Sequence, residues 1–230
     1  GSTALFVNDQ DKNYWLNLLG YNVGATETGV TLANLAAKPE LRQVGSVMHS
    51  TPILLTQSGK ITVGTGGVLD TTDRDDYLLF GSTQGLLHVV HAGKNDTDAN
   101  RGKEVFAFAP HEMMQNQKAA FLSETSSTGG SSNLFYGIDA PWTAYTQYVA
   151  KSDGTLTVKD SGRTVKETDD GDEIALKGLQ WVYGGLRMGG RSYYALDLSN
   201  LDSPSLKFHI DPANSKIYKS STTTSGVTAL

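Results

Sequence analysis

The chain has 230 residues, a net charge of −5 and no cysteine. This length suits one large β domain or two small ones. The lack of cysteine excludes a disulfide framework, a thiolate zinc site and a thiol nucleophile, and no basic stripe for nucleic acid is present. No apolar run approaches the roughly 20 residues that cross a bilayer. No signal peptide is found, and Gly1-Ser2 resembles a cloning scar.

Residues 1–44 are predicted to be a lead-in segment with short helices. VTLANLAAKPELRQV has apolar residues at helical spacing, which Pro39 interrupts. From Val47 the pattern changes, and VMHSTPILLT, KITVG, DDYLLFGS, LLHVVHA and KEVFAFAP are typical of strands. HEMMQNQKAAF (111–121) is the one helix predicted in the middle of the chain.

The second half returns to strands after a polar stretch. SETSSTGGSSN (123–133) is predicted to be a surface loop. YTQYVAKSDGTLTVKD predicts a hairpin that turns at Ser152-Asp153-Gly154. GRTVKETDDGDEIALKG is charged and is expected to lead out to solvent, and WVYGGLRMGGRSYYALDLSN and SLKFHID are predicted strands.

Two segments of the chain match each other. The same pattern occurs at 77–92 and again at 181–195. It consists of an apolar strand that ends in glycine, a turn that glycine closes, and a second strand. Each copy of the pattern leads to a third strand, EVFAFAP after the first and LKFHID after the second. Three consecutive antiparallel strands make most of a propeller blade. The predicted fold class is therefore all-β, a partial β-propeller or a fragment of one, with one or two short helices and long surface loops. Unrelated hairpins in a β-sandwich are the alternative.

The stretch GSVMHSTPILL raises the question of hydrolytic chemistry. Neighbouring side chains of an extended strand project to opposite faces, so His49 cannot act as a base for Ser50. No GxSxG elbow surrounds Ser50, and Pro52 follows closely. We expect His49, Ser50 and Thr51 to form hydrogen bonds at the end of a strand, and we predict no catalytic residues.

The remaining histidines do not suggest a zinc site. His88 and His91 fall in a valine-rich strand, which directs them to opposite faces. His111 opens the predicted helix but lacks the second histidine of an HExxH motif. His209 is expected to be a partly buried, hydrogen-bonded strand residue.

Calcium is the one metal for which weak candidates exist. Asp96, Asp98 and Asn100 alternate as at the start of an EF-hand loop. Arg101 occupies the position of the turning glycine, and Ala107 that of the bidentate glutamate, so a solvated turn is the competing interpretation. No other cofactor is predicted. A set of aromatic residues is expected either to form a binding face or to pack between blades: Trp142, Tyr145, Tyr148, Tyr183, Tyr193 and Tyr194.

Taken in order, five segments resemble the C-terminal propeller of PilC/PilY-type pilus-tip proteins: GSVMHSTPILL, DDYLLFGSTQGLLHVVHAG, GKEVFAFAPHEMM, LFYGIDAPWTA and WVYGGLRMGGRSYYALDLSNLDSP. Relatives carry a similar HSTP strand and similar glycine-bounded hairpins. The resemblance runs from about Leu41 to about Asp211. The order of the motifs is more specific than any single motif.

The resemblance implies a propeller that is larger than the blades counted over 45–230, which are two clear ones and a third less clear, so the chain resembles a fragment of such a propeller. It also implies a non-enzymatic protein of Gram-negative type IV pili, located at the pilus tip, on the cell surface or at the outer membrane. Such proteins support pilus biogenesis, adhesion, twitching motility or DNA uptake, and their partners are minor pilins and host or abiotic surfaces. Nucleic acid would be a partner only through uptake. The family's calcium loop has no match here.

Two other functions stay open at the level of sequence. A quinoprotein-type dehydrogenase that uses pyrroloquinoline quinone has similar blade repeats. However, Phe106 and Phe208 stand where those blades dock a tryptophan, and vicinal cysteines are missing. The second open function is that of an outer-membrane assembly scaffold with a similar propeller.

Overall fold

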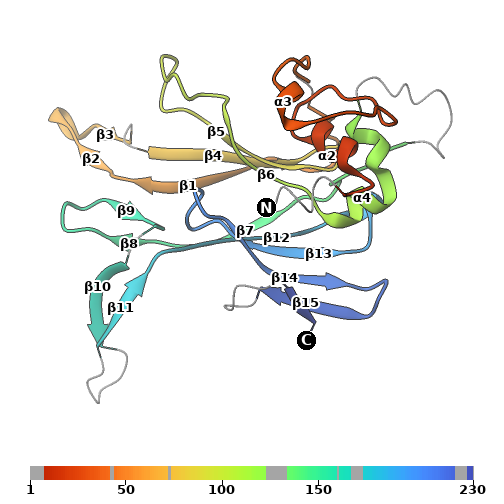
Figure 1. Ribbon diagram of the computed structural model, residues 1–230. Helices are drawn as coiled ribbons and strands as arrows, with labels where there is room; N and C mark the ends of the chain where they lie inside the picture. Colours follow the sequence, from red (N-terminus) through yellow and green to blue (C-terminus); the bar gives the residue numbers. More distant parts are fainter. Residues whose placement is uncertain are drawn as a thin grey trace.

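The computed structural model is mostly β, with a few short helices and several antiparallel sheets. Two six-stranded sheets lie face to face (Figure 1). The structure describes the following residues: 8–41, 44–71, 74–122, 134–159, 161–166, 173–220 and 227–229. The predicted loop at 123–133 lies outside them.

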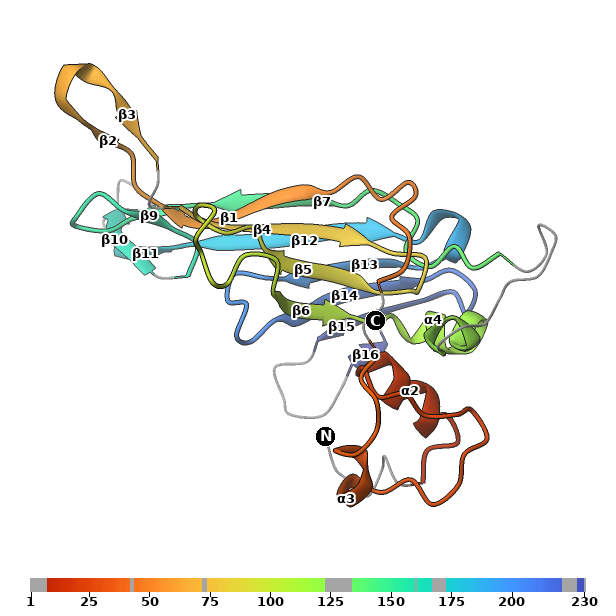
Figure 2. The ribbon, with the colours of Figure 1, turned by 90° about the horizontal axis from the view of Figure 1, so that it is seen from above.

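The first sheet is built around four sequential antiparallel strands, which we call the first meander. They are β1 (Ile53–Gly59), β4 (Arg74–Gly81), β5 (Leu87–His91) and β6 (Glu104–Phe108). Between β1 and β4 the chain forms a small hairpin of β2 (Thr62–Val63) and β3 (Leu69–Asp70). This hairpin extends beyond the sheet (Figure 2).

The second sheet repeats this plan in a second meander. Its strands are β7 (Thr143–Gln147), β12 (Leu179–Gly185), β13 (Tyr193–Asp197) and β14 (Ser205–Asp211). Two more strands, β15 (Lys216–Ser220) and β16 (Val227–Ala229), continue the same sheet.

The insertion between β7 and β12 holds two hairpins. The first, β8 (Val149–Ala150) and β9 (Leu156–Thr157), pairs through β9 with the end of β1 and so joins the first sheet. Its turn contains Gly154 at a φ of 86°, which confirms the hairpin predicted at 152–154. The second hairpin consists of β10 (Ser161–Lys166) and β11 (Glu173–Lys177).

The predicted internal match is present in the strand register. In the first meander the β4–β5 pairing runs from Tyr77–His91 to Gly81–Leu87. In the second, the β12–β13 pairing runs in the same register from Trp181–Asp197 to Gly185–Tyr193. The third strands follow the same rule, because Val89 pairs with Phe106 and Ala195 with Phe208. Residues 75–81 of β4 therefore correspond to residues 179–185 of β12, which lie 104 positions later.

Alternation along the strands gives each meander two faces. We call forward the face that carries Tyr77, Leu79, Leu87 and Val89 in the first meander, and Trp181, Tyr183, Tyr193 and Ala195 in the second. We call rear the face that carries Leu78, Phe80, His88 and Val90 in the first, and Val182, Gly184, Tyr194 and Leu196 in the second.

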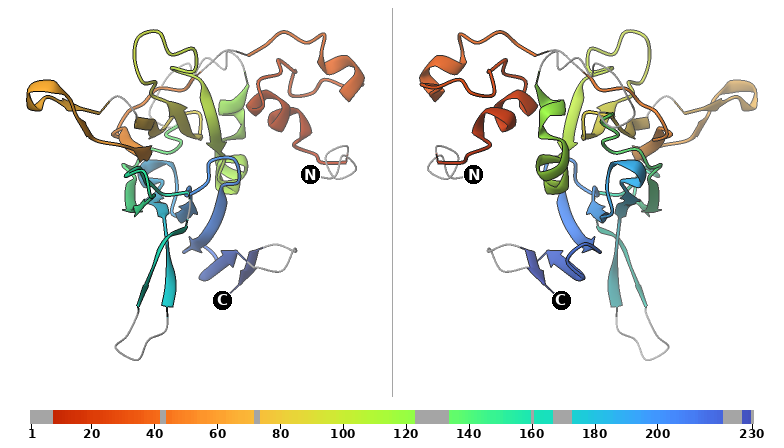
Figure 3. Two further views of the ribbon diagram at one scale, coloured as in Figure 1. Left: turned by 90° about the vertical axis from the view of Figure 1, so that its left-hand side faces the viewer. Right: turned by 90° about the vertical axis from the view of Figure 1, so that its right-hand side faces the viewer.

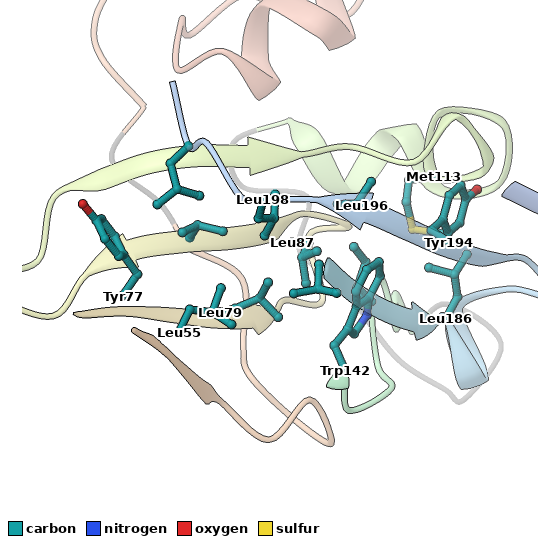
Figure 4. Packing of buried hydrophobic residues seen from close by; sticks show 14 of the residues in the cluster. Leu55, Tyr77, Leu79, Leu87, Met113, Trp142, Leu186, Tyr194, Leu196 and Leu198 are labelled. Carbon is teal, nitrogen blue, oxygen red and sulfur yellow. The ribbon is translucent and has the colours of Figure 1, made fainter. Parts of the chain in front are cut away.

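The core forms where the forward face of the first meander meets the rear face of the second. Leu79, Leu87 and Val89 are at most 1% exposed and share one cluster with Val182 and Leu196 (Figure 4). Opposite faces of the two copies are therefore buried against each other. Burial of such side chains contributes roughly 1.5–3 kcal/mol each.

Equivalent strands lie over one another in the two sheets (Figure 2). The sheets are close together along the edge that carries β1 and β7, and they diverge toward β6 and β15 (Figures 1 and 3). A Cβ at Gly81 would lie 2.3 Å from the carbonyl oxygen of Ile138, just ahead of the second meander. A side chain there would force the two backbones apart, so the glycine permits their close approach.

Helices are short. α4 (His111–Gln117) continues as a 3₁₀ turn over Lys118–Phe121, as predicted for 111–121, and its Met113 is fully buried. The lead-in segment holds α2 (Lys12–Leu18) and α3 (Leu32–Leu35) around a second small cluster. α3 is much shorter than the predicted helix. It ends before Pro39, whose ring disfavours a helical conformation at the preceding residue.

The strand predicted from Val47 begins only at Ile53. Pro52 has no N–H to donate to a ladder, and the six residues before β1 form bends and irregular chain. Similarly, KITVG contributes only the two residues of β2. Within the described residues, no helix is long and apolar enough to cross a bilayer.

Candidate functional site

Most of the polar side chains that could take part in chemistry lie at one end of the two sheets, near the turns that join β4 to β5 and β12 to β13. We call this the turn end. The opposite end, called the insertion end, carries the β2–β3 hairpin, the β5–β6 loop and the β8–β11 insertion (Figure 1).

His49 and Ser50 stand at the turn end, immediately before β1. Ser50 is 1% exposed, and its Oγ accepts a hydrogen bond from the Gly81 N–H at 2.7 Å. The predicted role of Ser50, bonding at the end of a strand, is confirmed. His49 instead lies 2.8 Å, through Nδ1, from Oδ1 of Asp139. The two neighbours therefore serve different partners and do not form a nucleophile–base pair.

Asp139 joins His49 to a third residue. Its side chain is fully buried, and its Oδ2 accepts a hydrogen bond from Arg187 at 3.2 Å. The side chains of His49 and Arg187 are both half-exposed. Arg187 has a φ of 50°, which residues other than glycine rarely adopt. The buried carboxylate thus links the entry to the first meander with a turn of the second.

Sequence reasoning missed Asp139 and Arg187. The pairing of Ile53 with Leu79 and of Thr143 with Tyr183 makes Thr143 the equivalent of Ile53. By the same offset of 90 residues, Asp139 is the equivalent of His49. The two stretches, HSTP at 49–52 and DAPW at 139–142, share no residue at equivalent positions, so the sequence carried no signal for Asp139.

A second polar chain links Ser82, His88 and Glu104. Ser82 Oγ is 3.0 Å from His88 Nε2, and His88 Nδ1 is 2.5 Å from Glu104 Oε2. This order of hydroxyl, imidazole and carboxylate is that of a serine hydrolase triad. His88 also stacks on Phe80, with ring centroids 5.2 Å apart.

The surroundings of this chain do not suit acyl transfer. Ser82 and His88 are 1% and 3% exposed, so a substrate carbonyl has no approach to the hydroxyl. An oxyanion hole needs free N–H donors beside the nucleophile. The N–H groups of Ser82, Thr83 and Gly85 are each already bonded to a backbone carbonyl. The chain therefore fastens the β4–β5 turn to β6.

The other histidines are each held separately. His91 Nδ1 accepts a hydrogen bond from the Gly93 N–H, on the other face of β5 from His88. Among the described residues, no three His, Cys, Asp or Glu side chains come together as a metal site would require. Near His111, the carboxylate of Glu112 accepts hydrogen bonds from the backbone of Arg191 and Ser192 and clamps the β12–β13 turn.

His209 is partly buried, as predicted, but it stacks rather than bonding through Nε2. Its ring lies between those of Tyr194 and Tyr218. The ring centroids are 4.4 Å apart with Tyr194 and 5.5 Å apart with Tyr218, and the interplanar angles are 10° and 21°. Burial lowers the pKa of His209, although Asp211 and Glu112 oppose this. Burial also raises the pKa of Tyr194 to about 12, so His209 and Tyr194 stack as neutral rings at physiological pH.

The calcium candidates lie in the β5–β6 loop of the insertion end. Arg101 donates to Asp96 at 2.7 Å, and Lys103 donates to Asn100 at 3.2 Å. Asp98 accepts from the N–H groups of Lys94 and Asn100, which lowers its pKa. A cation would have to displace these donors. Calcium stays a prediction, and a rise in melting temperature with added Ca²⁺, absent in Asp98→Ala, would support it.

The insertion end also exposes apolar side chains. Four aliphatic residues of the β2–β3 hairpin are 65–68% exposed: Ile61, Val63, Val68 and Leu69. Val63 pairs with Leu69, so both lie on one face of the hairpin. Exposed apolar groups gathered in this way are typical of interaction sites.

Comparisons with known proteins supply no relative. No family model matches the chain, and no curated protein or solved structure matches it either.

Proposed function

We propose that the two meanders are neighbouring blades of a β-propeller, and that the protein is a non-enzymatic, extracellular adhesion and assembly module of a type IV pilus. The observation that carries the propeller is the burial of opposite faces, forward on rear, between equivalent sheets. A two-fold sandwich of the copies would bury equivalent faces. Repeats that are related by successive rotations about one axis bury opposite faces against each other. The sheets are closest beside β1 and β7, which fits an axis on that side (Figure 3).

The role in pili rests on the resemblance of the motifs and on the division between the two ends. The turn end carries the short β4–β5 and β12–β13 turns, buried polar side chains, and α4 of the β6–β7 connection. The insertion end carries three connections between strands of one meander, namely those between β1 and β4, between β5 and β6, and between β7 and β12. Binding residues are commonly placed on loops that a rigid scaffold positions. We assign surface attachment to this end, with the β2–β3 hairpin as its apolar contact.

The assignment is tested first by association with minor pilins. The purified chain is expected to retain minor pilins on a column and to compete with attachment of piliated cells. Retention equal to that of an unrelated acidic β protein would overturn the pilus assignment.

The contact surface is tested separately with Ile61→Ser/Leu69→Ser. The pair should weaken attachment several-fold while the melting temperature is unchanged, because neither side chain is buried. Val44→Ser is the matched control, since Val44 is 65% exposed but near the turn end. Equal loss of attachment in the control would remove the hairpin from the binding surface.

A further inference from the structure

The cluster of His49, Asp139 and Arg187 at the turn end has hydrogen-bonding groups that its structural role does not use. The Asp139 side chain is fully buried, whereas those of His49 and Arg187 are each 50% exposed. Asp139 contacts only Nδ1 of the imidazole and Nη1 of the guanidinium. Among the described residues, none bonds to the other ring nitrogen or to Nε and Nη2 of the guanidinium. A buried carboxylate thus holds two half-exposed side chains that keep unpaired nitrogens.

The backbone of Arg187 is strained in a turn that is otherwise rich in glycine. Its φ of 50° lies in the left-handed region, which glycine adopts readily and other residues rarely adopt. Gly184, Gly185, Gly189 and Gly190 surround it, yet none of these four has a φ in that region. The left-handed position is therefore the one that carries the guanidinium. Backbone strain that is retained in this way is typical of functional sites.

Close backbone contacts hold the three segments of the cluster in place. A Cβ at Gly189 would clash with the carbonyl oxygen of Gly137, and a Cβ at Gly137 would clash with that of Ser82. The segment before β1 is fixed in turn, because Ser50 Oγ accepts a hydrogen bond from the Gly81 N–H. A site that is rigid before its ligand arrives loses little conformational entropy on binding.

The unpaired nitrogens match a ligand that carries an acid group and a hydroxyl. The Nε–Nη2 edge of a guanidinium donates two parallel hydrogen bonds, which suit a carboxylate. The Asp139 carboxylate can only accept, so the hydrogen of the neutral His49 ring lies on Nδ1. Nε2 is then an acceptor, which pairs with a hydroxyl. A sugar acid such as a uronate carries both groups on one small molecule.

We propose that the cluster of His49, Asp139 and Arg187 binds the carboxylate and a hydroxyl of a sugar acid. Arg187 holds the carboxylate, His49 accepts a hydrogen bond from the hydroxyl, and Asp139 positions both side chains from below. The buried charge of Asp139 is balanced by the guanidinium, so it does not repel the ligand. The proposal does not depend on the pilus assignment, whose attachment surface lies at the insertion end.

Titration of the isotope-labelled chain with glucuronate, followed by NMR, tests the proposal. The ring signals of His49 and the Nε–H signal of Arg187 should shift together and saturate, while those of the exposed His111 should not. At equal pH and ionic strength, glucose should give no saturable shift, and acetate should bind about tenfold more weakly, because each lacks one of the two groups. Absence of saturation, saturable binding of glucose, or acetate that binds as tightly as glucuronate would overturn the proposal.

Arg187→Gln provides a second test, with Arg191→Gln as the matched control in the same turn. Arg191 is exposed, and only its backbone N–H is bonded within the described structure. Arg187→Gln should weaken glucuronate binding about tenfold or more, and Arg191→Gln should leave it unchanged. If Arg187→Gln unfolds, Arg187→Lys replaces it, since an ammonium keeps the charge beside Asp139 but cannot form two parallel bonds to a carboxylate. Affinity equal to that of the control in the Arg187 variant would remove Arg187 from the site and overturn the proposal.

Discussion

The two meanders share one register but differ in what their equivalent faces meet. The forward face of the first is packed against the second sheet, whereas the forward face of the second is open. The side chains differ accordingly, with Leu79 and Leu87 on the packed face and Tyr183 and Tyr193 on the open one. Aliphatic residues fill a close contact, while tyrosines tolerate water at the hydroxyl and still present a large apolar ring. The comparison therefore separates what the strand pairing requires from what the neighbouring sheet requires.

The largest effect is expected from shortening equivalent side chains on the two forward faces. Leu79→Ala should lower the free energy of unfolding by about 2–5 kcal/mol, because Leu79 is 1% exposed and leaves a cavity. The equivalent Tyr183→Ala should cost about 1 kcal/mol or less in the monomer. Urea denaturation of dilute protein, followed by circular dichroism, measures both. Equal losses would mean that the two faces are equally buried in solution.

The two rear faces give a second contrast, at Phe80 and its equivalent Gly184. A Cβ at Gly184 would lie 2.2 Å from the Trp142 ring, so even a methyl group is excluded where the sheets meet. Gly184→Ala should destabilise the protein by about 1–3 kcal/mol through overpacking. Gly64→Ala is the control, since its Cβ would have 3.5 Å to the nearest atom. A Gly184→Ala variant as stable as the control in the same denaturation assay would show that Trp142 moves freely.

A third prediction concerns His49 and Asp139, which precede the first strands of the two meanders. Asp139→Asn should cost about 1–2 kcal/mol, because the buried group loses its charge-assisted bonds to His49 and Arg187. His49→Ala should cost less, because its side chain is half-exposed. A double-mutant cycle from thermal unfolding should give a loss smaller than the sum of the two. Strict additivity would show that the pair is not coupled.

Much of the strand plan follows from local sequence. The hairpins at 77–92 and 181–197 are visible because alternating apolar residues run between glycines, and the turn at Gly85 has a φ of 100°. The helix at 111–117 and the hairpin at 152–154 were equally clear. The start of β1 was not, because the apolar residues from Val47 lack a pairing partner until Pro52 is passed.

The candidate site was less predictable, because its contacts join distant parts of the chain. His49 and Asp139 are 90 residues apart, and Arg187 reaches Asp139 only through an unusual backbone turn. The Ser82–His88–Glu104 chain depends on the register of three strands, which single-strand patterns do not specify. Its catalytic appearance and its closure to solvent are both tertiary properties. The aromatic residues divide by burial, and a binding face stays a prediction. Trp142 and Tyr194 are core, whereas Tyr145 and Tyr193 are exposed on the forward face.

The smallest effect is expected on the third strands, where His209 of β14 is the equivalent of Ala107 in β6. The pKa of His209 is lowered from 6.5 by burial between Tyr194 and Tyr218. The unfolded chain therefore takes up a proton at a higher pH than the folded one. Stability is lost as the pH falls through about 6.5 toward the folded pKa, and it is regained as the pH rises.

Replacing His209 isolates this contribution from those of the other four histidines. His209→Gln should lose less stability than the unsubstituted chain when urea denaturation is repeated between about pH 7.5 and pH 5.5. The effect is small because the ring is only partly buried and Asp211 and Glu112 favour its protonated form. Ala107→His in the first meander would place an imidazole at the equivalent position, without the tyrosine stack. Its pKa, followed by NMR, should stay above that of His209, and equal values would mean that the stack does not exclude water.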